Sequence, residues 1–175
     1  MNRVFTKSSI LSMLVFLAVC LTMAGCGYHI SGRAGKMPGD ITSMSVPIFV
    51  NETDKPDIEG PLTSAFVEEF VTTVRVMEKS DAVMRGAIKY YHLTPVSYSK
   101  SDISQEYRLT VVIAVSLVSA SDGTVIWEDD NIERYADFTV NTSDITATRQ
   151  AETDAFTKIS KDISRLTKER MVENF

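Results

Sequence analysis

The chain has 175 residues and a formal net charge of −5, with 23 acidic against 18 basic side chains. An acidic chain lacks the basic footprint that nucleic-acid binding requires, so we expect no nucleic-acid partner. Its two cysteines, Cys20 and Cys26, both lie near the N-terminus. The rest of the chain can therefore form neither a disulfide nor a cysteine-based metal site.

Residues 1–25 have the three parts of a secretory signal peptide. Arg3 and Lys7 provide the basic start, an apolar stretch follows over residues 10–23, and small residues lead to Cys26. Small residues that end on a cysteine resemble the lipobox of bacterial lipoproteins. This resemblance implies cleavage before Cys26 and acylation of its thiol, with palmitate among the chains. An uncleaved transmembrane anchor is the alternative, but the apolar stretch is shorter than the ~20 residues that a spanning helix needs.

Acylation would make Cys26 the lipidation site and hold the mature protein on a membrane, since each buried methylene contributes roughly 0.8 kcal/mol. Residues 26–40 are rich in glycine and show little periodicity, which is typical of a tether between a lipid and a domain. Residues 41–175 are predicted to form a single domain. At about 150 residues, the mature chain is long enough to bury a real core.

Residues 41–50 predict the first strand of this domain, in which Pro47 indicates an edge or a bulge. A polar loop follows over residues 51–60. Pro61 then fits the first position of a helix, where a missing N–H costs nothing. One face of this helix is apolar. Its side chains are Leu62, Ala65, Phe66, Phe70 and Val74.

Three further strands are predicted after the helix. Residues 82–97 alternate with period two, with Met84, Gly86, Ile88 and Tyr90 on one face and Arg85, Ala87, Lys89 and Tyr91 on the other. Residues 106–120 form the strongest strand, whose odd-numbered side chains from Tyr107 to Leu117 are apolar. A tight turn over residues 121–123 leads into a fourth strand over residues 124–128, which extends irregularly towards Val140.

The last segment, roughly residues 143–172, is a charged amphipathic helix with Ser143 or Asp144 as its cap. Its apolar residues recur at helical spacing. They are Phe156, Ile159, Ile163 and Leu166. The order of elements predicts an α+β, two-layer sandwich, in which two helices cover one face of a four-stranded, mostly antiparallel sheet. The other face is left open to a partner or to water.

Short motifs occur in order along the whole mature chain. They are GCGYHISG at residues 25–32, SVPIF at 45–49 with Asn51 and Thr53, DAVMRG at 81–86, TPVSY at 94–98, EYR at 106–108, GTVIWE at 123–128 and RQA at 149–151. Each motif alone is weak, but their order and spacing together resemble the LptE family, the outer-membrane lipopolysaccharide-assembly lipoproteins.

The resemblance implies a role in assembly rather than a reaction. Members of this family sit as a plug inside the LptD β-barrel, help that barrel to assemble, and bind lipopolysaccharide as it moves to the outer leaflet. The implied partners are thus an LptD-type barrel, lipopolysaccharide and, through the lipid anchor, the membrane. Gly27 agrees with an outer-membrane location facing the periplasm and the barrel lumen, because an aspartate after the lipidated cysteine signals retention at the inner membrane.

The residues give no indication of catalysis, so we expect no enzyme, no cofactor and no metal. No Gly-x-Ser-x-Gly motif frames a serine. His29 is interpreted as a tether residue and His92 as a surface or strand-end residue. Asp129 and Asp130 lack the donor spacing of a calcium loop. They are interpreted as a solvated strand end.

Three cations are candidates for a lipopolysaccharide-binding site on the open face. Arg85 and Lys89 lie on one side of their strand, and Arg108 lies on the polar side of the next strand. If these strands pair, the three side chains form one patch suited to the phosphates of lipid A. The alternative is three ordinary surface cations that pair with Glu106 or Asp129, each pair contributing well under ~1 kcal/mol.

Two further features have open alternatives. The cations of the terminal helix are interpreted as a solvated face, with a role in lipid-phosphate binding as the alternative. They are Lys158, Lys161, Arg165, Lys168 and Arg170. Trp127 is interpreted as a core anchor beside the hairpin turn, with a contact to the barrel wall as the alternative.

The sequence therefore predicts a lipid-anchored, non-enzymatic plug and assembly partner of an outer-membrane barrel in lipopolysaccharide transport. The first alternative is an envelope lipoprotein that faces the periplasm and binds another ligand without a barrel partner. A hydrolase with an unrecognised serine is the second alternative.

Overall fold

The computed structural model describes residues 37–98 and 104–173. Cys26, His29 and most of the predicted tether thus lie outside the described residues. The elements in chain order are η1 (Pro38–Asp40), β1 (Ser43–Ser45), β2 (Val50–Asn51), α2 (Glu59–Phe70), β3 (Arg75–Val76), β4 (Ala82–Tyr98), β5 (Ser104–Ser119), β6 (Val125–Thr139) and α3 (Ile145–Glu173).

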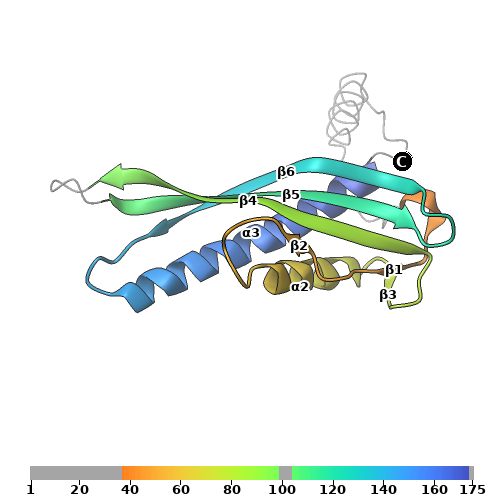
Figure 1. Cartoon of the computed structure of the whole chain (residues 1–175), viewed down its shortest axis with the longest axis horizontal. Helices are drawn as coiled ribbons and strands as arrows, with labels where there is room; N and C mark the ends of the chain where they lie inside the picture. The colour runs from red at the N-terminus through yellow and green to blue at the C-terminus, as the bar shows by residue number, and fades with distance from the viewer. Residues whose placement is uncertain (1–36, 99–103, 174–175) are drawn as a thin grey trace, which may run out of the picture. The chain divides into compact units, whose positions relative to one another are not determined.

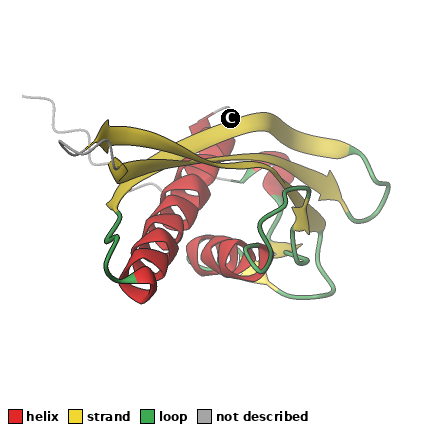
Figure 2. Ribbon diagram, turned by 60° about the vertical axis from the view of Figure 1, so that its left-hand side comes forward, coloured by secondary structure: helices red, strands yellow, loops and turns green. Residues whose placement is uncertain are grey.

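The described strands form one mixed sheet in the order β3-β1-β4-β5-β6, with β2 also paired to β4. The long strands β4, β5 and β6 are antiparallel, whereas β1 and β2 pair with β4 in parallel. Helices α2 and α3 lie on the same side of the sheet (Figures 1 and 2). This arrangement confirms the predicted α+β sandwich with two helices on one face.

The described sheet has six strands rather than the predicted four. The predicted strand over residues 41–50 is divided into β1 and β2 around Pro47, which has no N–H for a ladder. The second additional strand, β3, contains two residues and pairs with β1 in parallel. Strands of two residues are too short to show a hydrophobic period, so the sequence pattern missed them.

A β-bulge at Lys89 changes which face the second half of β4 presents. Ile88 pairs with Ile113 and Tyr90 pairs with Val112, so Lys89 is the extra residue. Beyond the bulge Tyr91 packs against the core, and Tyr90 is 46% exposed on the open face. The predicted facing of these two tyrosines was therefore wrong, because strict alternation does not survive an inserted residue.

The core lies between the sheet and the two helices. The predicted inward face of β5 is confirmed, and its buried side chains are Leu109, Val111, Ile113, Val115 and Leu117. The predicted helix faces are also buried, with Leu62, Phe66 and Phe70 on α2 and Phe156, Ile159 and Ile163 on α3. Trp127 is 8% exposed, in agreement with a core anchor.

The helix ends follow elementary rules with one correction. The Asp144 carboxylate accepts a hydrogen bond from the Ala147 backbone N–H at 2.9 Å and so caps α3, as one of the two predicted residues. Helix α2 begins at Glu59 rather than at Pro61. Pro61 is tolerated in the first turn, because backbone N–H groups there have no partner within the helix.

Phe49 joins the strand edge, α2 and the centre of β4. Its backbone N–H donates to the Thr63 hydroxyl of α2 at 3.0 Å, and its ring centroid lies 4.8 Å from that of Phe66. The same ring lies directly on Gly86, where an added Cβ would be 2.3 Å from ring carbons. Glycine is therefore required at position 86 so that the Phe49 ring can approach the β4 backbone.

We predict that Gly86→Ala lowers the free energy of unfolding by about 1–3 kcal/mol, because the added methyl overpacks the Phe49 ring. Denaturant or thermal melting of the purified protein measures this change. Gly60→Ala is the matched control, since Gly60 lies inside α2 and a Cβ there meets nothing within 4 Å. This control gains up to about 1 kcal/mol from helix propensity. Equal stability of the two variants would contradict the packing argument.

Candidate functional site

The three candidate cations do not gather into one patch. Arg85 pairs in register with Ser116, whereas Arg108 pairs with Thr94 at the other end of the hairpin. Ser116 and Arg108 are eight positions apart on β5, which corresponds to about 27 Å of strand. Lys89 lies between them, at the bulge. All three come from the paired strands β4 and β5, as expected, but they are distributed along the sheet.

Arg108 is bound to a carboxylate of the neighbouring strand. Its Nε and a terminal nitrogen donate to the two oxygens of Asp137 at 2.7 and 2.9 Å, and its guanidinium lies 4.2 Å from the centroid of the Tyr135 ring. The hydrogen bond from Arg108 lowers the pKa of Asp137. The Arg108 guanidinium is therefore held in place, and its positive charge is balanced by the Asp137 carboxylate within the sheet.

Lys89 is also paired, and Arg85 is not. The Lys89 ammonium donates to both oxygens of Glu52 at 2.8 and 2.9 Å. Arg85 is exposed and has no ion-pair partner among residues 37–98 and 104–173. The predicted alternative partner Asp129 is bound to Arg170 of α3, 2.5 Å from nitrogen to oxygen. Of the three candidates, Arg85 thus presents the least compensated charge.

Several cations of α3 are likewise engaged within the fold. Lys168 pairs with Glu69 of α2, Arg170 with Asp129 of β6, and Arg165 with Asp162 one turn earlier at 3.1 Å. The first two pairs join α3 to its neighbours, whereas the third lies within the helix. They support the interpretation of this helix as a packed, solvated element.

Two of the sequence motifs have structural roles. One oxygen of the Asp81 carboxylate accepts hydrogen bonds from the Thr42 backbone N–H and hydroxyl and from the Ser43 backbone N–H, at 2.9–3.1 Å. These bonds, the Thr42 backbone bond first, lower the pKa of Asp81. Asn51 accepts two hydrogen bonds from Thr53 and donates one to the Lys55 carbonyl. Asp81 thus fastens β1 to β4, and Asn51 shapes the loop after β2.

A polar cluster that the sequence did not indicate connects three elements. One oxygen of Glu152 in α3 accepts hydrogen bonds from the Lys55 ammonium and the Tyr91 hydroxyl, each at 2.7 Å. The Tyr91 ring packs on Phe156 with centroids 5.8 Å apart. The bulge at Lys89 turns Tyr91 towards α3, and no periodicity in the sequence could have shown this.

Burial and charge act in opposite directions on this cluster. Burial disfavours ionisation of Glu152, but the hydrogen bonds from Lys55 and Tyr91 outweigh it and lower the pKa of this carboxyl. Burial, followed by the hydrogen bond to Glu152, raises the pKa of the Tyr91 hydroxyl. Glu152 is therefore ionised and Tyr91 neutral at neutral pH.

We predict that Glu152 makes folding stability depend on pH in the acid range. Its folded pKa lies below the ordinary value of 4.5, so its stabilisation is present above pH 4.5 and is lost as the pH falls through the folded pKa. Melting temperatures between pH 7 and pH 3 should fall less steeply for Glu152→Gln than for the wild type. Glu169→Gln, on the same helix with a side chain 55% exposed, is the control. An unchanged slope in Glu152→Gln would contradict this role.

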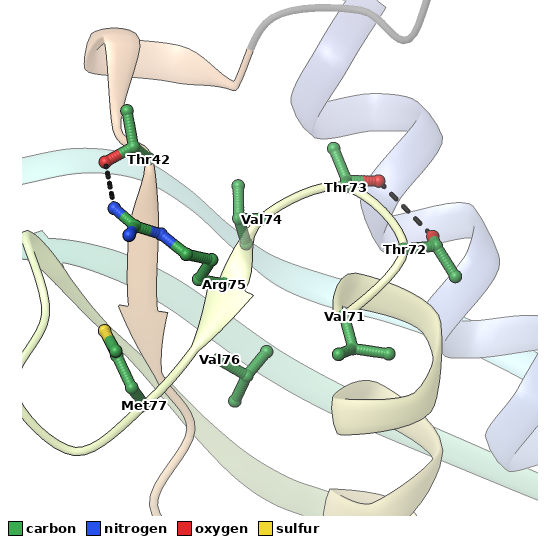
Figure 3. A pocket seen from close by; sticks show the side chains of 8 residues that line it. All are labelled: Thr42, Val71, Thr72, Thr73, Val74, Arg75, Val76 and Met77. Carbon is green, nitrogen blue, oxygen red and sulfur yellow. Dashed lines mark hydrogen bonds between the residues drawn. The ribbon is translucent and has the colours of Figure 1, made fainter.

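A groove of about 570 Å³ lies where α2 ends and β3 begins (Figure 3). It is lined by Thr42 and by residues 71–77, and its side chains include the exposed Val71 and Met77. Arg75 donates to the Thr42 hydroxyl at 3.4 Å. The lining contains no carboxylate, histidine or cysteine. The groove therefore lacks the side chains that general acid–base catalysis or an activated nucleophile–base pair would need.

The described residues contain no group of three or more His, Cys, Asp or Glu side chains that could hold a metal. His92 is exposed, as expected, with its ring centroid 5.4 Å from that of Tyr90. None of the helices in residues 37–98 and 104–173 is long and apolar enough to cross a membrane.

The fold thus defines a class, an α+β module in which two helices cover one face of a mixed sheet. The family model described as "LptE: Lipopolysaccharide-assembly" matches residues 41–171. The chain belongs to the LptE lipopolysaccharide-assembly family, which confirms the resemblance of the motifs. Members of this family are assembly proteins and not enzymes. No curated protein sequence matches this chain.

Solved structures show a similar fold at low identity. A lipoprotein structure from Caulobacter crescentus has a TM-score of 0.54 and 8% identity, and the match covers 71% of this chain and 88% of that chain. Lipoprotein B from Nitrosomonas europaea has a TM-score of 0.48 and 17% identity, covering 85% and 92% of the two chains. Rare lipoprotein B from Shewanella oneidensis has a TM-score of 0.47 and 14% identity, covering 75% and 92%. Of these matches, only the Caulobacter crescentus structure supports an argument, and that argument concerns the fold and nothing beyond it.

Proposed function

We propose that this protein is a lipid-anchored outer-membrane lipoprotein that plugs an LptD-type β-barrel, assists its assembly and takes part in lipopolysaccharide transport to the outer leaflet. The match of the family model over residues 41–171 carries the proposal. The open sheet face supports it, because no described helix covers this face and Tyr90 and Tyr135 are exposed there. Aromatic side chains are enriched where proteins meet partners.

The anchor in this proposal is an acylated Cys26. Met37 and Pro38 are buried against the domain, so about 10 residues separate this cysteine from the packed part of the chain, a reach of up to about 35 Å if extended. Such a tether is long enough for the domain to enter a barrel while the acyl chains stay in the lipid layer.

We predict that the wild-type protein, labelled with radioactive palmitate and extracted in gentle detergent, carries the label and co-purifies with an outer-membrane barrel protein. Cys26→Ala should lose the label because it has no acyl acceptor, whereas the control Cys20→Ala should keep it. Equal label in Cys26→Ala would overturn the anchor. A labelled wild-type protein without a barrel would instead favour the alternative, an envelope lipoprotein that binds another ligand.

We further propose that Arg85, Lys89 and Arg108 contribute to lipopolysaccharide binding, with unequal weights. An anionic phosphate gains most from a cation without a carboxylate partner, and of the three only Arg85 has none within residues 37–98 and 104–173. Lys89 and Arg108 must share their donors with Glu52 and Asp137. Such exposed ion pairs contribute little to folding, so charge reversal here leaves the fold intact.

We predict that Arg85→Glu weakens lipopolysaccharide binding by the purified protein about tenfold, corresponding to ~1.4 kcal/mol. The single reversals at Lys89 and Arg108 should have smaller effects, and all binding should weaken with added salt. Arg75→Glu is the matched control, because Arg75 is an exposed arginine at the β3 edge that has no carboxylate partner within the part of the chain that the structure describes. Undiminished binding by a well-folded triple variant would reject these cations as the site.

A further inference from the structure

A group of side chains outside the hydrophobic core lies on the open face of the sheet. It comes from residues 90–94 of β4, 108–112 of β5 and 133–137 of β6. The register places Tyr90, Val112 and Glu133 in one cross-strand row and His92, Thr110 and Tyr135 in the next. Thr94, Arg108 and Asp137 form the third row. We call this three-by-three arrangement the aromatic platform. It faces away from the helices and lies on paired backbone rather than on loops.

Three of its side chains are exposed rings. Tyr90 is 46% and Tyr135 57% exposed, and His92 is also exposed. Tyr90 and His92 form a continuous aromatic edge along β4, with centroids 5.4 Å apart. Tyr135 lies two strands away on β6, about 9.6 Å across the sheet, with the smaller Thr110 between. Exposed rings at both borders of the platform, with the smaller Thr110 between them, form a surface on which a flat ligand can stack.

The polar groups of the platform are paired with one another but keep unused hydrogen-bond donors and acceptors. Arg108 uses two of its five N–H donors on Asp137, and the carboxylate keeps further lone pairs. The stacking of Arg108 on Tyr135 keeps both side chains in position. The remaining donors and acceptors, together with the Thr94 and Thr110 hydroxyls, can therefore bind a ligand without rearrangement.

This chemistry selects among possible occupants. Docking of a purely apolar surface would remove water from the Arg108–Asp137 pair and from the Thr110 hydroxyl without offering new hydrogen-bond partners, which is unfavourable. A phosphate would compete with Asp137 for Arg108 and would approach Glu133 in the same platform. A neutral ring with C–H faces and several hydroxyls satisfies both requirements, since its faces stack on aromatic rings and its hydroxyls bond to the Arg108 guanidinium.

We propose that the aromatic platform binds the sugar portion of lipopolysaccharide. This proposal rests on the proposed function and adds a second contact to it. Arg85 lies in register with Ser116, four positions along β5 from Val112, or about 14 Å. The platform and Arg85 are therefore separate enough to contact different parts of one large glycolipid.

The test uses the full-length protein in mild detergent and two probes. The first probe is a deacylated, dephosphorylated core oligosaccharide, and the second is intact lipopolysaccharide. Saturation-transfer NMR detects contact with sugar ring protons, and calorimetry gives the affinities. We expect Tyr135→Ala and Tyr90→Ala each to weaken oligosaccharide binding at least tenfold, and Tyr135→Phe to retain it because the ring is kept. Val125→Ala is the matched control, an exposed apolar side chain, 56% exposed, at the other end of β6.

The outcomes separate the two proposals. Failure of the wild-type protein to bind the oligosaccharide, with binding of intact lipopolysaccharide preserved, overturns the platform and leaves the proposed function standing. Failure to bind either probe overturns lipopolysaccharide binding itself. Oligosaccharide binding that persists in the Tyr90→Ala, Tyr135→Ala double variant also overturns the platform. Loss in both tyrosine variants but not in Val125→Ala, with unchanged melting curves, supports it.

Discussion

The pairing of β4 with β5 is the constraint on which the rest of the structure depends. This register runs from Ala82 opposite Ser119 to Tyr98 opposite Ser104, and it decides which side chains face the helices. Because strand side chains alternate with period two, the bulge at Lys89 reverses the facing of residues 90–95, up to the next irregularity between Pro95 and Ser97. Tyr91 thereby reaches Glu152 of α3, and Tyr90 is left on the open face.

The two faces of the sheet have separate roles as a result. The inner face is filled by α2, α3 and Phe49, and its packing requires a glycine at position 86. The outer face carries exposed rings and balanced charges that contribute little to the core. A module of this kind can present a binding surface without loss of stability, because binding and folding use different sides of the same strands.

The residues of the family motifs can also be sorted by the part of the structure that they serve. Asp81, Gly86 and Asn51 serve the joints between strands and loops, where a hydrogen-bonded carboxylate, a missing side chain or an amide is physically required. None of these residues belongs to the platform or to the cations proposed to bind lipopolysaccharide. The same motifs also contain Arg85 and Arg108, two of the cations proposed to bind lipopolysaccharide, and Thr94 of the platform. The family motifs thus combine residues of the architecture with residues of the proposed binding face.

The sequence by itself determined the element types, the buried faces of α2, β5 and α3, a cap at Ser143 or Asp144 and the family, because these depend on local periodicity and short motifs. Only the tertiary structure decided the strands β2 and β3, the bulge, the Lys55–Glu152–Tyr91 cluster and the separation of Arg85 from Arg108. These features depend on register and on contacts between distant segments. A periodic pattern shows which side of a strand a residue occupies, but it does not show how far along the sheet its neighbours lie.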